Sequence, residues 1–475
     1  MTGPPSHFSA RRRVEASVGL ADQSVPPTRQ EFIVRSYAEA SRHFPVGSCS
    51  PVTFLEACLA TIEELEPSIR AFEVLRLEGT HAAARASEER WRRGKQLSTI
   101  DGMPIGVKDI IETRDMPTQN GSAYFKGHST GRDAASVQAL RGAGAIVLGK
   151  TVTTEFAGPF ASKTCNPHRL AHTPGGSSSG SAAAVAAGML PAALGTQVVG
   201  SIVRPASYCG TYAIKPTVGT VNRGGSHDGL SQSAHGVLAA SLEDAWNVLR
   251  EIALRVGGDP GHHPLARAKR ALRSSRPKRL GVLRTGGYEA AEEYATRDLE
   301  RTCRRLAAAG VEFVTAENNP LMARLEAAVE DAQRLSSEIV GYESLWPLRS
   351  YLDDDASKLS PLLRERVLAA ERRSPEDYAV LLEGRDVARR IHDELRGGVD
   401  AIITLSATGT APEGLASTGN TVFNTPASYL GVPAVNLPLF KHDGLPLGLQ
   451  VVGFAGADLE ALCVARGLNE LHTNA

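Results

Sequence analysis

Two charged side chains stand out in this sequence because the residues around them carry almost no charge. Lys108 lies in the run 105–111, where Asp109 is the only other residue that is not apolar, and Arg204 is the only formally charged residue within residues 173–214. A charge in a protein interior is expensive unless it is paired or discharged. Lysine can lose its proton, and desolvation lowers the pKa of its ammonium group. Lys108 is therefore a candidate general base near neutral pH.

Each of these charges also has a purely structural interpretation. Lys108 would then form an internal salt bridge, for example with Asp109. Arg204 cannot be deprotonated, so it must be paired or must face a cleft. Its guanidinium fits a carboxylate or carbonyl group of a substrate, or alternatively a buried pair that holds the local loop. The sequence leaves both interpretations open.

The uncharged stretch supplies hydroxyl groups and glycine backbone. Residues 173–181 read Thr-Pro-Gly-Gly-Ser-Ser-Ser-Gly-Ser, and residues 195–205 read Gly-Thr-Gln-Val-Val-Gly-Ser-Ile-Val-Arg-Pro. Such segments let amide N–H groups approach a ligand closely, as stabilisation of an oxyanion requires. With Pro191 in its middle, segment 173–203 is too weakly apolar for a membrane span. We expect it in the protein interior.

Two common motifs match this cluster formally and are rejected. Residues 176–180 fit the G-x-S-x-G nucleophile elbow with Ser178 as nucleophile, but an elbow follows a strand and residues 166–174 do not read as one. The glycine-rich run also lacks the Gly-Lys-Ser/Thr that a phosphate-binding loop needs.

Taken together, the motifs resemble a known family, the amidase-signature hydrolases of the malonamidase and small-amide type, which use a Ser–cis-Ser–Lys triad. The resemblance rests on Gly-Met-Pro-Ile-Gly-Val-Lys-Asp at residues 102–109 and on the segments 174–188 and 195–206. Further matches are Gly210 and residues 215–217, and weaker echoes lie at residues 149–157, 241–245 and 444–450. The matching segments extend over residues 50–470, almost the whole chain.

By position, the resemblance implies that Ser201 is the nucleophile, Ser177 the serine that follows a cis peptide bond, and Lys108 the base. A serine hydroxyl needs a base within hydrogen-bond reach, and an intermediate hydroxyl can pass the proton to a neutral lysine. The resemblance also implies that no metal or organic cofactor is used. It further implies oxyanion donors in the backbone N–H groups of Val198, Val199, Gly200 and Ser201, with Thr196 as a supporting hydroxyl.

Two features concern the shape of the pocket. The family commonly has a small or polar residue and then glycine where this chain has Val198 and Val199. Their β-branched side chains narrow the site and restrict the backbone, although only backbone groups are needed there. The low-charge segment 401–440 is expected to form the opposite wall, with Thr410, Asn420, Thr421 and Asn424.

Strands alternate with helices along the chain, which predicts an α/β protein with a mixed central β-sheet flanked by helices. Residues 1–30 are expected to form a loosely ordered arm and residues 31–475 a single domain, with a charged helical layer at about 257–400. Helices are predicted at residues 51–65, 81–93, 133–143, 181–190, 241–254, 294–308, 321–342 and 359–395. Strands are predicted at residues 145–148, 279–283 and 311–314.

The composition limits the classes of function. The 475 residues carry 52 Lys and Arg against 52 Asp and Glu, and zero net charge argues against nucleic-acid or anionic-membrane partners. The 6 cysteines form no C-x-x-C pair, so neither a zinc site nor a disulfide framework is indicated. No secretory signal is seen either, so a cytoplasmic location is expected. A homodimer is left open.

The expected activity is hydrolysis of a small acyl amide, aryl amide or carbamate through an acyl-serine intermediate. One alternative is the glutaminase-type subunit of a tRNA-dependent amidotransferase, which shares these motifs and requires partner subunits. The other is a catalytically inactive relative that serves as a binding component.

Overall fold

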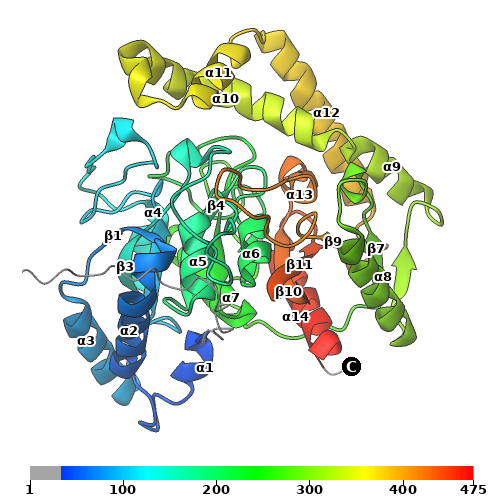
Figure 1. The fold of residues 1–475 in the computed structure, drawn as a ribbon. Helices are drawn as coiled ribbons and strands as arrows, with labels where there is room; N and C mark the ends of the chain where they lie inside the picture. Colours follow the sequence, from blue (N-terminus) through cyan, green and yellow to red (C-terminus); the bar gives the residue numbers. More distant parts are fainter. Residues whose placement is uncertain (1–33, 474–475) are drawn as a thin grey trace, which may run out of the picture. The chain divides into compact units, whose positions relative to one another are not determined.

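An 11-stranded sheet runs through the computed structural model, which describes residues 34–473 of the chain (Figure 1). The order of its strands is β1-β3-β2-β4-β6-β5-β10-β11-β9-β7-β8, with both parallel and antiparallel neighbours. The prediction of a mixed sheet flanked by helices is therefore confirmed. The strands are β1 (Phe72–Leu75), β2 (Pro104–Lys108), β3 (Ile146–Thr151), β4 (Ala192–Gln197), β5 (Tyr212–Lys215), β6 (Ala234–Ala239), β7 (Arg279–Val282), β8 (Glu312–Val314), β9 (Ala401–Leu405), β10 (Ala434–His442) and β11 (Leu445–Val452).

The helices begin where the sequence supplies capping residues. Ser50 caps the second helix by accepting from the Thr53 amide, and Ser241 caps the seventh in the same way. The α-helices are α1 (Tyr37–Ser41), α2 (Pro51–Ile69), α3 (Thr80–Arg92), α4 (Ala135–Gly142), α5 (Ser179–Ala186), α6 (Val203–Cys209), α7 (Leu242–Val256), α8 (Glu293–Ala308), α9 (Pro320–Val329), α10 (Ala332–Asp355), α11 (Pro361–Ala370), α12 (Pro375–Glu394), α13 (Thr425–Leu430) and α14 (Asp458–Thr473).

The uncharged stretch forms the interior of the molecule, as expected. Every residue from 173 to 197 is buried. A Cβ atom on Gly180 of α5 would lie 2.1 Å from the carbonyl oxygen of Ala71 and 2.4 Å from the amide nitrogen of Val152. Glycine is therefore required where α5 approaches the neighbouring backbone. This close approach places the serine cluster beside the ends of the central strands.

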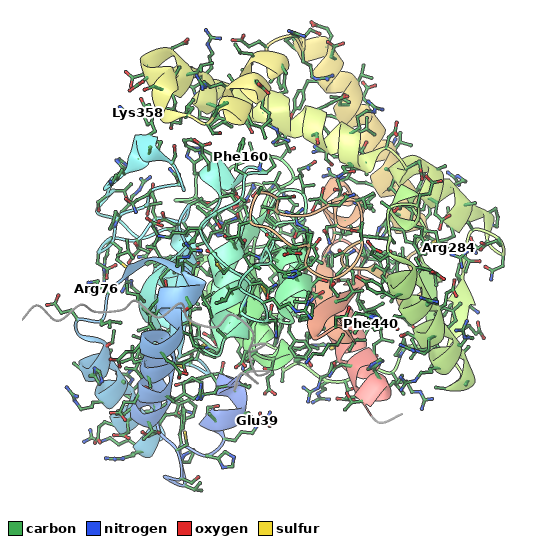
Figure 2. The ribbon with its side chains drawn as sticks, viewed as in Figure 1. Glu39, Arg76, Phe160, Arg284, Lys358 and Phe440 are labelled. Atoms are coloured by element: carbon green, nitrogen blue, oxygen red, sulfur yellow. The ribbon has the colours of Figure 1, made fainter. Side chains whose placement is uncertain are left out.

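The charged block 257–400 contributes both strands and helices. β7 and β8 extend the sheet, whereas α10, α11 and α12, here called the cap helices, lie together above it in Figure 1. Among the cap helices, α10 and α11 share a small apolar cluster, and Phe160 from the body of the protein contacts that cluster (Figure 2). The described residues belong to one compact unit, while the expected arm at residues 1–30 lies outside them.

Two of the predicted long helices are interrupted. Segment 321–342 contains the end of α9 at Val329 and the start of α10 at Ala332, and segment 359–395 contains the end of α11 and the start of α12. The second break follows from Ser374, which caps α12 just before Pro375. Within residues 34–473, no helix has the length and apolar character needed to cross a membrane.

Two glycine-to-alanine substitutions in helices should have opposite effects on stability. Gly180→Ala forces a methyl group into backbone atoms and should lower the free energy of unfolding by about 3 kcal/mol or more. Gly341→Ala in α10 meets only a side-chain contact at 3.7 Å, so higher helix propensity should raise stability by up to about 1 kcal/mol. Denaturant midpoints of the two variants measure this, and equal shifts would contradict the packing described for α5.

Candidate active site

Lys108 occupies the end of β2, between β3 and β4, where it is completely buried. Its Nζ atom lies 2.7 Å from Ser177 Oγ, 2.8 Å from Thr196 Oγ1 and 3.4 Å from the Thr196 carbonyl oxygen. Two segments that lie 69 and 88 residues further along the chain thus converge on one amine. The structure brings together the lysine, the serine and the threonine that the motifs single out.

The acid beside Lys108 in the sequence pairs with a different lysine. Asp109 Oδ1 lies 3.0 Å from Lys150 Nζ, and both side chains are buried. No carboxylate in the described part of the chain comes within 4.0 Å of Lys108. The structural alternative of a Lys108–Asp109 salt bridge is therefore wrong. The Lys150 ammonium also donates to the Thr118 hydroxyl at 2.6 Å, which holds it beside Asp109.

Burial lowers the pKa of Lys108 to about 7, and the Asp228 carboxylate only partly opposes this shift. A large share of the side chain is consequently an unprotonated amine at neutral pH. A neutral amine that is hydrogen bonded to a hydroxyl can accept its proton, which is the requirement for a general base.

The serine cluster brings the backbone of residues 177–178 against that of residue 201. The Gly176–Ser177 peptide bond is cis. The Ser178 amide donates to the Ser201 carbonyl oxygen at 3.3 Å, and the Thr154 amide donates to the Ser177 carbonyl oxygen at 3.3 Å. Ser177 is buried, whereas Ser201 is half-buried. Ser201 is thus the more accessible of the two serines, as a residue that attacks a substrate must be.

Arg204 is buried and binds neutral oxygens rather than an acid. Its Nη2 atom donates to the Gly176 carbonyl oxygen at 2.7 Å and to Thr418 Oγ1 at 3.0 Å. Its Nε and Nη1 atoms have no partner among residues 34–473, and burial lowers its pKa to about 10. The buried-pair interpretation is therefore corrected: Arg204 holds the serine segment through a carbonyl group.

The expected oxyanion donors are free of internal acceptors. The amide N–H groups of residues 198–201 donate to no acceptor in the portion of the chain that the structure describes. A Cβ atom on Gly200 would lie 2.9 Å from Asn424 Oδ1 and 3.2 Å from Thr421 Cγ2. Segment 401–440 thus lies against this stretch, as expected for the opposite wall. Thr410, in contrast, bonds to Tyr294 of α8 at 3.2 Å.

Several polar residues of the site carry no sequence signal of their own. Gln232 and Ser428 donate to carbonyl groups of the 198–201 stretch, and His235 lies opposite Thr196 in the β4–β6 pair. Burial lowers the pKa of His235 to about 4, so its ring is neutral at pH 7. These residues come from distant segments and match no motif spacing, so only the folded chain reveals them.

Ser178 has a structural place instead of an elbow. Its hydroxyl donates to the Thr196 carbonyl oxygen and accepts from the Thr196 amide, both at 3.3 Å. No strand lies between Thr151 and Ser178 in the described chain. The G-x-S-x-G match is therefore fortuitous.

Within residues 34–473, no three His, Cys, Asp or Glu side chains gather in a way that would hold a metal ion.

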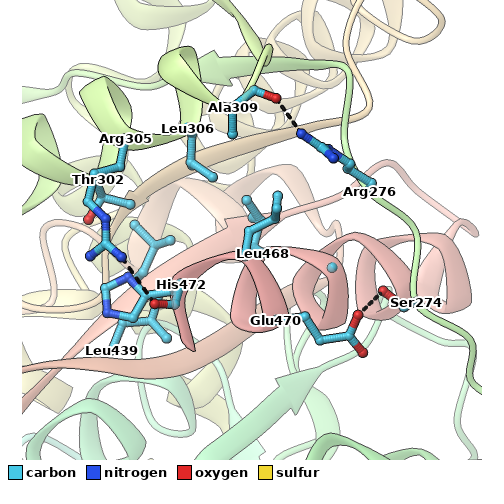
Figure 3. A pocket seen from close by; sticks show the side chains of 13 residues that line it. Ser274, Arg276, Thr302, Arg305, Leu306, Ala309, Leu439, Leu468, Glu470 and His472 are labelled. Atoms are coloured by element: carbon cyan, nitrogen blue, oxygen red, sulfur yellow. Dashed lines mark hydrogen bonds between the residues drawn. The ribbon is translucent and has the colours of Figure 1, made fainter. Parts of the chain in front are cut away.

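A separate hollow of about 290 Å³ lies between α8 and α14, and none of its lining residues belongs to the site (Figure 3). Its polar groups are engaged with their neighbours. Arg276 donates to the Ala309 carbonyl oxygen, Arg305 donates to the His472 carbonyl oxygen at 3.2 Å, and Ser274 donates to Glu470 at 2.6 Å. This hollow is therefore separate from the groups around Lys108.

Similar sequences and structures are found among known proteins. The family model described as Amidase matches residues 53–462. A glutamyl-tRNA(Gln) amidotransferase subunit from Chloroflexus aggregans is 34% identical over 86% of this chain and 90% of its own, and the corresponding protein from Anaeromyxobacter sp. (strain K) is 34% identical over 87% and 92%. A crystal structure of an amidase matches with a TM-score of 0.79 at 27% identity over 92% of this chain and 99% of its own. The native peptide amidase from Stenotrophomonas maltophilia matches with a TM-score of 0.71 at 27% identity over 92% and 96%.

The depressed pKa of Lys108 should be visible in the stability of the protein. Between about pH 7 and 10 the unfolded chain binds a proton at this residue that the folded chain does not, so wild-type stability rises with pH. Relative to Lys108→Met, the wild type should gain about 2 to 3 kcal/mol between pH 7 and 9.5. Denaturant midpoints of both proteins at the two pH values measure the difference. Burial also lowers the pKa of Lys215 to about 7, but this residue is present in both proteins, so its effect cancels in the comparison. The same dependence of stability on pH in the two proteins would contradict the lowered pKa of Lys108.

Proposed function

The chain belongs to the amidase family and acts on carboxylic amide C–N bonds, and we propose that it does so through an acyl-enzyme on Ser201. The observation that carries this proposal is the 2.7 Å contact between Lys108 Nζ and Ser177 Oγ, with no carboxylate of residues 34–473 within 4.0 Å of the amine. The half-buried position of Ser201 and the free N–H groups beside it support its role as the nucleophile.

In the proposed reaction, neutral Lys108 takes the proton of the Ser177 hydroxyl as Ser177 takes that of Ser201. The Ser201 oxygen attacks the carbonyl carbon, and the negative charge that forms on the carbonyl oxygen is stabilised by the N–H groups of residues 198–201. The proton then passes back along the same path to the leaving nitrogen, the C–N bond breaks, and an ester on Ser201 remains. Water, deprotonated by the same path, hydrolyses this ester and frees the acid.

We propose a small acyl amide, aryl amide or carbamate as the substrate. The two valines at 198 and 199 support a restricted site, because their β-branched side chains crowd the stretch that faces the carbonyl group. Arg204 has two nitrogen atoms, Nε and Nη1, without a protein partner among the described residues, which supports a further role in binding a carboxylate or carbonyl group of the substrate.

A second candidate function is that of an amidotransferase component, which the names of the curated relatives favour. The two candidates differ in what the isolated chain does. A glutaminase-type subunit requires partner subunits, whereas an independent amidase turns over as a lone chain. Turnover of a panel of small amides and glutamine by the purified chain separates them, and activity only on adding partner subunits would favour the second.

A fluorophosphonate should form one adduct per chain, located on Ser201. The reagent phosphonylates a serine only where a base activates it. Peptide mapping by mass spectrometry distinguishes Ser201 from Ser177 and Ser178. Ser201→Ala should lose the adduct and lower kcat by at least about 10⁴-fold. An adduct on Ser178, or none in the folded wild type, would refute the proposed nucleophile.

The reaction should depend on pH through one group. Because only unprotonated Lys108 can accept a proton, kcat/KM should rise with pH through about 7 and level off above about 8. The residual kcat/KM of Lys108→Ala should not show this rise with pH. The measurement is kcat/KM from pH 5 to 9 with a substrate for which the chemical step is limiting. A wild-type profile that is flat over this range would exclude Lys108 as the base.

A further inference from the structure

We propose that Gln232 is a positioning residue that aims the backbone N–H group of Val199, within the 198–201 stretch, at the oxyanion. This inference rests on the proposed function of that stretch. It assigns a task to a buried side chain that lies 31 positions from the proposed nucleophile and matches no motif. Gln232 is fully buried, and its Nε2 atom donates to the Val198 carbonyl oxygen at 3.0 Å.

The hydrogen bond from Gln232 to the Val198 carbonyl group also orients the next N–H group, because both groups belong to one planar peptide unit. In a trans peptide the C=O group of one residue and the N–H group of the next share a plane and point in opposite directions. A donor that fixes the carbonyl group of Val198 therefore also fixes the direction of the Val199 N–H group. The N–H group is turned away from Gln232, toward the side on which no acceptor of the described chain meets it.

The same arrangement repeats along the stretch. The Val199 carbonyl oxygen accepts from Ser428 Oγ at 2.7 Å and from Gln197 Nε2 at 3.3 Å, which fixes the Gly200 N–H group. The Gly200 carbonyl oxygen accepts from the Arg204 amide at 3.1 Å, which fixes the Ser201 N–H group. Among residues 34–473, Gln232 is the single donor to the Val198 carbonyl oxygen. The first peptide plane of the series thus depends on this one side chain.

Gln232 is itself fixed by contacts of the residues on both sides of it. The Ser231 amide donates to Glu343 of α10 at 2.8 Å, and its hydroxyl accepts from Arg385 of α12 at 2.7 Å. On the other side, the Ser233 hydroxyl donates to Asp228 at 3.0 Å. The cap helices therefore hold the short loop from which Gln232 reaches the site.

A neutral amide is also the donor type that suits this position. A lysine or arginine would add a positive charge close to Lys108 and would lower the proton affinity of the amine further. Two titratable groups of the described chain interact with Lys108: Asp228, whose charge raises the pKa of the amine, and His235, which is neutral at pH 7. Gln232 therefore fixes the carbonyl group without changing the charge around the base.

The decisive variant is Gln232→Met, which keeps the length of the side chain and removes the donor. Loss of one oxyanion donor costs about 100- to 1,000-fold in kcat, and misaiming one should cost about 10- to 100-fold. We expect that loss in kcat with KM changed by less than about twofold, because ground-state binding uses the donors less. The affinity for a boronic acid inhibitor, which forms a tetrahedral anion on the nucleophile, should fall in parallel with kcat/KM.

Gln138→Met, on an exposed position of α4, is the matched control and should retain wild-type kinetics. Gln232→Asn, whose shorter amide cannot reach Val198, should show the same loss and decides the question if the Met variant does not fold. The acid limb near pH 7 should persist in every active variant, because Lys108 is unchanged.

Wild-type kcat in folded Gln232→Met, or a loss carried by KM alone, would overturn the positioning role while leaving the proposed function intact. Failure of the proposed function has a different signature, since the wild type itself would then form no fluorophosphonate adduct on Ser201.

Discussion

The proposed chemistry depends on one buried amine that has no carboxylate of the described residues within 4.0 Å. Lys108 is fully buried, and its hydrogen bonds go to two hydroxyl groups and a carbonyl oxygen. An adjacent carboxylate would hold the ammonium form and remove the base. Asp109, the obvious candidate, is instead paired with Lys150 from the neighbouring strand β3. The second lysine therefore keeps the first one free of an acid.

Neutral partners recur throughout the site. Arg204 binds a carbonyl oxygen and a hydroxyl, and Gln232 and Ser428 bind carbonyl oxygens. Buried polar groups of this kind destabilise a fold unless they are hydrogen bonded, and the Nε and Nη1 atoms of Arg204 have no partner in the described chain, which lowers its stability. The large apolar core around the sheet offsets that cost. The polar groups of the proposed site therefore lower the free energy of unfolding of the protein.

The sequence predicts those features of the fold and the site that depend on residues close together in the chain. Ser50 and Ser241 indicate where their helices begin, and the charge-poor surroundings of Lys108 indicate a buried amine. Strand β6 has no such signal, because Ala-His-Gly-Val-Leu-Ala is buried on both faces and shows no alternation of apolar and polar residues. Gln232 escapes prediction for a related reason. Its task arises from a loop that the cap helices hold, and no short-range pattern records such a contact.

The proposed reacting groups and the cap helices lie in different parts of the fold. This separation explains why sequence motifs identify the reaction better than the substrate. The proposed base lies on β2 and the serine segment lies beside β4, where the neighbours are backbone and small side chains that tolerate little change. The cap helices meet the body through aromatic and polar contacts, such as the stacked rings of Phe156 and Tyr351 at 5.6 Å and the bond from Tyr124 to Asp354 at 2.6 Å. Half-buried and exposed contacts of this type accept substitution far more readily than a packed strand does. Residues that reach the substrate from such a surface can therefore vary while the chemistry stays fixed.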